Sequence, residues 1–247
     1  MKTIINNFLR KFFKIEIKKF RPQSSIFNNL HLKTIKRSPV IFDIGANEGQ
    51  SIERYLNTFV SPKIYAFEPN EDAFQILFEK YSKNKNIVLN NFAIGEKKGN
   101  KYLNYTIKSG NSSLFKLNMN SNWIKNKALN FDVKPKNYIN KIKKTKMFSL
   151  DSYIKKEKIN SIDLLKIDTQ GYEHNVLIGS KNSLKKKIKN IELEIMLDNC
   201  YDTDTSIYKI EKVLNPKNFK IKGIYSNKRD FLVGDTFGCY LFYKNLN

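Results

Sequence analysis

Short apolar runs alternate with amphipathic segments along the chain from residue 39 onward. The run Val40–Ile44 predicts a buried strand, and residues 50–59 have the spacing of a helix. Residues 63–68 and 87–89 predict two more strands, with a helix over residues 70–81 between them. This alternation at short spacing is typical of a parallel α/β sheet.

The second half of the chain repeats the alternation after one interruption. We expect helices at residues 150–158, 172–187 and 205–214, strands at 162–168 and 191–196, and a closing antiparallel pair at 219–225 and 239–243. The stretch 100–145 is rich in Lys and Asn, and we expect an insertion over the face of the sheet. The prediction is one α/β domain over residues 39–247. It has a mostly parallel central sheet with a closing antiparallel strand and helices on both faces.

Residues 1–38 form a separate N-terminal extension in this prediction. Within residues 1–22, Ile4, Phe8 and Phe12 fall near helical spacing among many Lys residues, which favours a basic amphipathic helix. Such a helix packs on the domain or makes peripheral contact with a membrane surface, and we favour packing. No apolar run approaches the ~18–20 residues of a membrane span. With two cysteines, expected to be reduced, the sequence favours a cytoplasmic protein, with any membrane contact at the inner face.

The composition is strongly basic. The 247 residues include 45 Lys or Arg against 23 Asp or Glu, a formal net charge of +22. Such a charge suits a nucleic-acid or membrane partner. Only five of the basic residues are Arg, however, and Arg is the residue favoured for bidentate phosphate contacts. The charge alone therefore does not assign a partner.

Chemistry-bearing residues gather where the predicted strands end. Asp43 ends the first strand and precedes a turn with Gly45 and Gly49. Glycines at a strand-to-helix turn allow close approach of a ligand. Their spacing is not that of a dinucleotide-binding turn, and a carboxylate there would oppose a diphosphate but suit an ammonium group.

The next two strand ends extend the same crevice. Glu68 can accept hydrogen bonds from both hydroxyls of a ribose, and the backbone of residues 91–95 can hold the edge of an adenine. The carboxyl ends of parallel strands meet at one edge of a sheet, so these groups should face one ligand. A nucleoside with a charged amino-acid tail fits them, and S-adenosylmethionine is the candidate cofactor.

Four segments resemble FkbM-family methyltransferases: residues 40–49 (VIFDIGANEG), 66–70 (AFEPN), 91–95 (NFAIG) and 163–173 (DLLKIDTQGYE). The resemblance covers about residues 39–244, and the order and separation of the first and last segments are specific. It implies a class I, Rossmann-like methyltransferase fold, S-adenosylmethionine as cofactor, and O-methylation of a sugar, glycan or related small molecule.

The resemblance also implies positions for the cofactor and the reaction. The residues that would surround the methionine moiety are Asp43, Gly45, Ala46, Asn47 and Gly49. Those that would lie by the ribose and the adenine are Glu68, Asn70, Asn91 and Ala93. Asp168, at the end of the fourth central strand, would lie near the transferred methyl group.

Three carboxylates are candidates for the chemistry. We expect Asp168 to orient or deprotonate the acceptor hydroxyl, with help from Glu173. A helix-capping role or an ion pair with Lys166 is an equal alternative for Glu173. Glu194 lies on a central strand, and a buried carboxylate there should face the substrate. We expect no metal at Asp168 and Glu194, because no His-rich cluster accompanies them.

Other functions remain open at this point. An RNA methyltransferase would explain the charge, but residues 166–169 (KIDT) lack the N/D-P-P-Y/F signature of base-amino enzymes. A non-catalytic basic module on the same fold is the second rival, and the intact strand ends argue against it. Residues 109–113 are either an acceptor-contacting loop or a solvated turn. We expect a small-molecule or glycan acceptor and disfavour a nucleic-acid partner.

Overall fold

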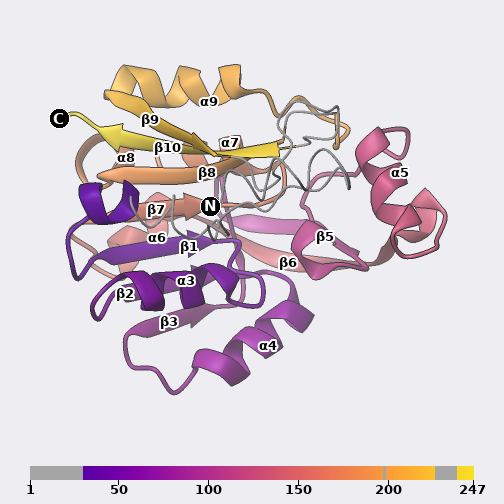
Figure 1. The fold of residues 1–247 in the computed structure, drawn as a ribbon, viewed down its shortest axis with the longest axis horizontal. Coiled ribbons are helices and arrows are strands. Elements are labelled where there is room, and N and C mark those ends of the chain that lie inside the picture. The colour runs from indigo at the N-terminus through magenta and orange to yellow at the C-terminus, as the bar shows by residue number, and fades with distance from the viewer. Residues whose placement is uncertain (1–29, 197–198, 226–237) are drawn as a thin grey trace, which may run out of the picture.

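The computed structural model describes residues 30–196, 199–225 and 238–247. Within these residues, seven strands form a central sheet in the order β3-β2-β1-β7-β8-β10-β9 (Figure 1). Their bounds are β1 Val40–Ile44, β2 Lys63–Phe67, β3 Ile87–Asn90, β7 Leu164–Ile167, β8 Asn190–Met196, β9 Phe219–Tyr225 and β10 Gly238–Asn245. The first five are parallel, whereas β10 pairs antiparallel with both β8 and β9. The predicted mostly parallel sheet with a closing antiparallel strand is confirmed.

The order of the strands defines where a ligand can bind. From β1 the chain moves outward through β2 and β3, and it later returns to place β7 on the other side of β1. A parallel sheet opens a crevice where the strand order changes direction, beyond the carboxyl ends of the strands. The turns after β1 and β7 therefore form the two walls of such a crevice.

Helices cover both faces of the central sheet. Their bounds are α3 Gln50–Thr58, α4 Glu71–Tyr81, α6 Leu150–Lys156, α7 Glu173–Ile178, α8 Ser183–Lys186 and α9 Ile207–Leu214. On one face, Ile52 and Tyr55 of α3 pack with Ile41 of β1. On the other, Val176 of α7 packs with Phe42. Neighbouring residues of a strand point to opposite faces, so β1 alone contributes to both apolar layers.

The long helix predicted over residues 172–187 is wrong, because α7 and α8 are two short helices. At Gly179, between them, a Cβ would lie 1.9 Å from the carbonyl oxygen of Gly95, so the chain crosses strand β4 in close contact. The Asp151 carboxylate then accepts hydrogen bonds from the backbone N–H groups of Asn182 and Ser183. These contacts fix the start of α8 on a new axis.

The stretch expected as an insertion over the sheet is a small second sheet with its own helix. Strands β4 Ala93–Gly95, β5 Gly99–Thr106 and β6 Ile139–Ser149 pair in the order β4-β6-β5. Helix α5 Asn122–Leu129 lies in the connection between β5 and β6, at one end of the molecule (Figure 1). Most of β6 is polar on both faces, so the sequence carried little apolar alternation to reveal it.

The last residues of the predicted N-terminal extension belong to the folded domain. Residues 30–34 are helical, and the side chains of His31 and Ile35 are buried against the sheet. The domain therefore begins before residue 39. The amphipathic helix and membrane contact predicted for residues 1–22 lie outside the described residues. Among the described helices, none has the length and apolarity to cross a bilayer.

Candidate active site

A cavity of about 840 Å³ lies at the carboxyl ends of the central strands. Its volume falls in the upper part of the range for small-molecule sites, roughly 300–1,000 Å³. Its wall includes the turns that follow the strands, the first residues of α3, side chains of β7, β8 and β10, the segment Lys108–Ser112, and α5 with the residue after it. Of the predicted site residues, those that line it are Gly45, Ala46, Asn47, Glu68, Ala93, Asp168 and Glu194.

The turn after β1 needs glycine at its first position. Gly45 has a φ of 80°, and a Cβ there would lie 1.9 Å from the backbone oxygen of Asp168. The turns after β1 and β7 therefore pass each other in direct contact. Asn47 follows, and its Oδ1 is buried without a hydrogen-bond donor in the described part of the chain. Gly49, at φ 94°, precedes α3 and packs on Tyr81 outside the cavity wall.

Asp43 lies below the cavity and does not line it. Its carboxylate is fully buried, accepts a hydrogen bond from the Ser51 hydroxyl at 2.5 Å, and lies 3.1 Å from Nζ of Lys166. The structure therefore does not meet the expectation that Asp43 faces an ammonium group of the ligand. The sheet register explains this, because Asp43 is paired directly with Lys166 on β7.

Glu68 faces the cavity from the end of β2. Its two carboxylate oxygens accept hydrogen bonds from the backbone N–H groups of Asn47 and Asn70, at 2.8 and 2.7 Å. Burial raises the pKa of Glu68 to about 7, with a small contribution from Asp43, and the two hydrogen bonds and Lys166 oppose this effect only in part. Glu68 can thus gain or lose a proton near neutral pH.

Two predicted neighbours of the cofactor support the wall from behind it. Asn70 is buried and caps α4, because its Oδ1 accepts from the backbone N–H groups of Asp72 and Ala73. The Asn91 side chain is exposed and donates to the backbone oxygen of Glu68 at 2.9 Å. Both therefore position the turn that carries Glu68 and lie outside the cavity lining.

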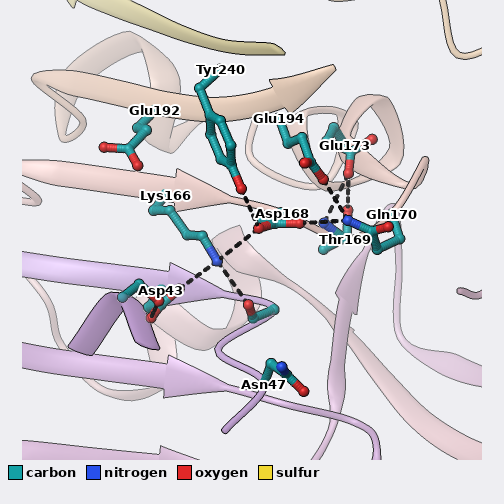
Figure 2. Close-up of polar contacts among 12 residues, drawn as sticks. Asp43, Asn47, Lys166, Asp168, Thr169, Gln170, Glu173, Glu192, Glu194 and Tyr240 are labelled. Carbon is teal, nitrogen blue, oxygen red and sulfur yellow. Dashed lines mark hydrogen bonds and ion pairs between the residues drawn. The ribbon is translucent and has the colours of Figure 1, made fainter. Parts of the chain in front are cut away.

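Asp168 is the centre of a polar network at the end of β7 (Figure 2). Its carboxylate accepts hydrogen bonds from the Tyr240 hydroxyl at 3.0 Å and from Nε2 of Gln170 at 2.9 Å, and it lies 3.5 Å from Nζ of Lys166. Burial opposes ionisation of this group, but Lys166 and hydrogen bonds that include those of Gln170 and Tyr240 outweigh it and hold the pKa below its usual value. Asp168 is thus a half-buried carboxylate kept ionised.

Glu194, on the neighbouring strand β8, has a raised pKa, in contrast to Asp168. Its carboxyl group accepts a hydrogen bond from the same Gln170 amide that binds Asp168 (Figure 2). Burial, followed by the negative charge of Asp168, raises the pKa of Glu194 well above its usual value. The pair therefore combines one ionised carboxylate with one neutral acid, an arrangement typical of sites that handle protons.

The structure places Glu173 outside the cavity, contrary to the expectation that it assists at the acceptor. Its Oε1 accepts hydrogen bonds from the backbone N–H groups of Thr169 and Gly171 and from the Thr169 hydroxyl. Gly171 has a φ of 100°, so the chain reverses between Asp168 and Glu173. Glu173 holds this turn, as a capping residue would, and forms no ion pair with Lys166 in the described residues.

A buried charged row, which sequence reasoning missed, crosses the central sheet, and two of its three members, Lys166 and Glu192, line the cavity. It consists of Asp43, Lys166 and Glu192, which are directly paired across β1, β7 and β8. Glu192 contacts Arg54 of α3 and His31, each at 2.6 Å. Burial alone would raise the pKa of Glu192, but Arg54 and His31 outweigh this effect and lower the pKa to about 2. The signal available in the sequence was Lys166 inside the apolar strand LLKI and Glu192 inside the strand NIELEIM.

The segment Ser109–Ser113 contacts the turns after β1, β2 and β7. The Ser109 hydroxyl donates to the Glu48 carboxylate at 3.0 Å, and Ser112 accepts from the Asn70 amide at 3.2 Å. The Ser113 hydroxyl donates to the backbone oxygen of Gln170 at 2.7 Å. Of the two interpretations given to residues 109–113, an acceptor-contacting loop or a solvated turn, the structure favours a loop of the site, because residues 109–112 line the cavity.

Comparison with known proteins gives the family. A model of the FkbM methyltransferase domain matches residues 43–221. The chain is 24% identical over 176 residues to the 2-O-methyltransferase NoeI of Sinorhizobium fredii (strain NBRC 101917 / NGR234), which covers 67% of this chain and 68% of that protein.

Solved structures agree at the level of the fold. The chain superposes on methyltransferase FkbM from Methylobacillus flagellatus KT with a TM-score of 0.58 and 16% identity, over 90% of this chain and 48% of that one, so it spans about half of that protein. Superposition on an rRNA methylase from Streptococcus thermophilus gives a TM-score of 0.51 and 12% identity, over 93% of this chain and 100% of that one. Superposition on a Streptococcus mutans protein in complex with SAH gives a TM-score of 0.50 and 12% identity, over 92% of this chain and 100% of that one. The class I, Rossmann-like methyltransferase fold predicted from the sequence is confirmed, and the chain belongs to the FkbM methyltransferase family.

Proposed function

We propose that the chain transfers a methyl group from S-adenosylmethionine to a hydroxyl group of an uncharged, sugar-like acceptor. The observation that carries this proposal is the cavity itself. It joins the turns after β1 and β2 to Asp168, a carboxylate held ionised by Lys166 and by hydrogen bonds from Gln170 and Tyr240. A methyltransferase that acts on a hydroxyl group needs such a proton acceptor beside the cofactor.

The residues around the cavity fit the cofactor. The turn at Gly45 brings backbone close to any ligand there, and the buried Oδ1 of Asn47 is an acceptor suited to the ammonium group of the methionine moiety. Each carboxylate oxygen of Glu68 has a lone pair left beyond its one backbone hydrogen bond, which suits the two ribose hydroxyls. When bound, S-adenosylmethionine supplies a methyl group activated by a sulfonium.

Asp168 is the base in this proposal. As the acceptor oxygen forms its bond to the methyl carbon and the bond from that carbon to sulfur breaks, the hydroxyl proton passes to Asp168. Lys166 keeps the carboxylate ionised beforehand, and the amide of Gln170 and the hydroxyl of Tyr240 hold its orientation (Figure 2). Positioned bases of this kind contribute about 10²–10⁴-fold to a rate.

The cavity has no large excess of cations, which favours an uncharged acceptor. In a chain of net charge +22, the cavity wall has four basic side chains, Arg54, Lys108, Lys127 and Lys166, beside four carboxyl groups, Glu68, Asp168, Glu192 and Glu194, of which Glu194 is neutral and Glu68 is partly protonated near neutral pH. Two of these cations are paired with acids of the same wall. A site that binds RNA requires an excess of cations to neutralise phosphates. The activity of the relative NoeI, 2-O-methyl transfer, supports oxygen as the atom methylated.

Two measurements test the proposal. Isothermal titration with S-adenosylhomocysteine should show saturable binding, and its absence at high micromolar ligand would overturn the cofactor assignment. Radiolabelled methyl transfer should then be compared across methyl hexosides, oligosaccharides and ribosomal RNA. Incorporation into a carbohydrate, lost in Asp168→Asn while cofactor binding is kept, is the expected result. Incorporation only into RNA would refute the acceptor class.

A further inference from the structure

One face of α5 forms part of the cavity wall. Trp123, Asn126, Lys127 and Asn130 all line the cavity. Their spacing of three, four and seven residues from Trp123 places them along one side of a helix. The Ser121 side chain accepts from the backbone N–H of Ile124 and caps the helix, so its start is fixed. We call these four residues the α5 wall.

The α5 wall lies on the same side of the cavity as the proposed base. The Trp123 ring packs on Tyr201, with 6.2 Å between ring centroids. The Tyr201 hydroxyl lies 3.5 Å from Oε1 of Gln170, whose amide in turn binds Asp168. A chain of two side chains therefore connects the α5 wall to the carboxylate. An acceptor whose hydroxyl reaches Asp168 can extend along this part of the cavity.

The side chains of the α5 wall are suited to hydroxyl groups. Asn126 and Asn130 are exposed, and neither side-chain amide takes part in a hydrogen bond within the described part of the chain. Residues four apart on a helix have Cβ atoms roughly 5–6 Å apart, so both amides can engage one sugar ring. Each amide both donates and accepts, as a hydroxyl does, whereas it offers a phosphate only its donors.

The other two residues of the α5 wall, Trp123 and Lys127, pack against each other and do not form an anion site. Trp123 is nearly buried and packs behind the amides. Nζ of Lys127 lies over the Trp123 ring at 5.8 Å from its centroid, so the lysine is attracted to the aromatic face. The wall therefore has two amides and a single cation, and it lacks the guanidinium groups favoured for phosphate binding.

We propose that the α5 wall binds the acceptor, and that Asn126 and Asn130 recognise adjacent hydroxyl groups of an uncharged pyranose. This inference rests on the proposed function, since it assigns the acceptor half of the same cavity. It makes the two asparagines specificity-determining residues, with no part in cofactor binding.

The test uses the full-length protein saturated with S-adenosylhomocysteine and the methyl α-pyranosides of glucose, galactose and mannose as probes. The side-chain amide signals of Asn126 and Asn130 in ¹⁵N-correlated spectra should shift saturably with at least one of them. Alanine at either position should weaken binding of that probe about fivefold, and the double variant should bind more weakly than either single variant. Asn126→Asp, which keeps the shape but removes the donors, should behave like the alanine variant.

Matched controls separate this inference from the function it rests on. Lys125→Ala, on the exposed side of the same helix and outside the cavity lining, should leave probe binding unchanged. All variants should bind S-adenosylhomocysteine like the wild type, which also shows that they fold. If the cofactor product binds but no pyranoside shifts the amides, or if only a single-stranded RNA oligonucleotide does, the inference is wrong while the methyltransferase assignment stands. If the cofactor product does not bind, the proposed function fails first.

Discussion

Glu68 should make cofactor binding depend on pH near neutrality. Its carboxyl group is buried at the end of β2, and its pKa lies at about 7 in the ligand-free protein. Two ribose hydroxyls donate best to an ionised carboxylate, because a protonated carboxyl group uses one oxygen as a donor itself. Cofactor binding therefore selects the ionised form and releases a proton when the solution is more acidic than the pKa.

The size of the effect follows from the pKa. With a value of about 7, Glu68 is roughly 90% protonated at about pH 6 and roughly 10% protonated at about pH 8. If only the ionised form binds, the dissociation constant at pH 6 should be about tenfold larger than at pH 8, or about 1.4 kcal/mol. The sign is fixed by the raised pKa: affinity rises as the pH increases through 7.

The assay is isothermal titration with S-adenosylhomocysteine at several pH values, in buffers of different ionisation enthalpy. Wild-type protein should release close to one proton at pH 6. Glu68→Gln keeps the shape of the side chain and cannot ionise, so its affinity should be weaker but nearly constant with pH once the titration of the ligand itself is subtracted. Equal pH dependence in both proteins would show that another group titrates, and the reasoning about Glu68 would be refuted.

Four further predictions concern the network around the cavity. Asp168→Asn should lower kcat about 10²–10⁴-fold in a methyl-transfer assay and leave the affinity for S-adenosylhomocysteine within about twofold of wild type, whereas unchanged turnover would exclude Asp168 as the base. Tyr240→Phe removes one hydrogen bond from Asp168 and should lower kcat by roughly tenfold or less, measured with cofactor affinity as the control. Arg54→Ala leaves Glu192 buried without its main cation and should cost about 3–5 kcal/mol in urea denaturation, with partial recovery when Glu192→Gln is added. Gly45→Ala places a Cβ against the Asp168 carbonyl at positive φ and should lower the melting temperature by several degrees or prevent folding, so a wild-type melting curve would contradict the described turn.

The sequence predicted the central sheet well, because its strands are apolar runs and its helices α3 and α9 are strongly amphipathic. It failed where those signals are absent. Strand β6 (INKIKKTKMFS) is mostly polar and has no regular alternation of apolar and polar residues, so the small sheet was expected as an irregular insertion. The break between α7 and α8 depends on a close contact between Gly179 and Gly95, and nothing near residue 179 reveals a neighbour 84 positions away.

The candidate site was predicted to a similar extent. Position along a strand placed Gly45, Glu68 and Asp168 at the cavity, since strand ends of a parallel sheet meet at one edge. The same reasoning could not tell that Asp43, two residues before Gly45, pairs with Lys166 and does not line the cavity. It could not foresee Tyr240 either, because an antiparallel strand from the end of the chain brings that hydroxyl to Asp168.

The buried charged row constrains how this chain can diverge from its relatives. Replacing Asp43, Lys166 or Glu192 alone leaves an opposite charge inside the sheet, at a cost of several kcal/mol, whereas replacing partners together can be nearly neutral. Lineages should therefore pass from one arrangement to another mainly by paired substitutions. In an alignment of the family, positions 43 and 166, and positions 54 and 192, should covary even where the cavity itself recognises different acceptors.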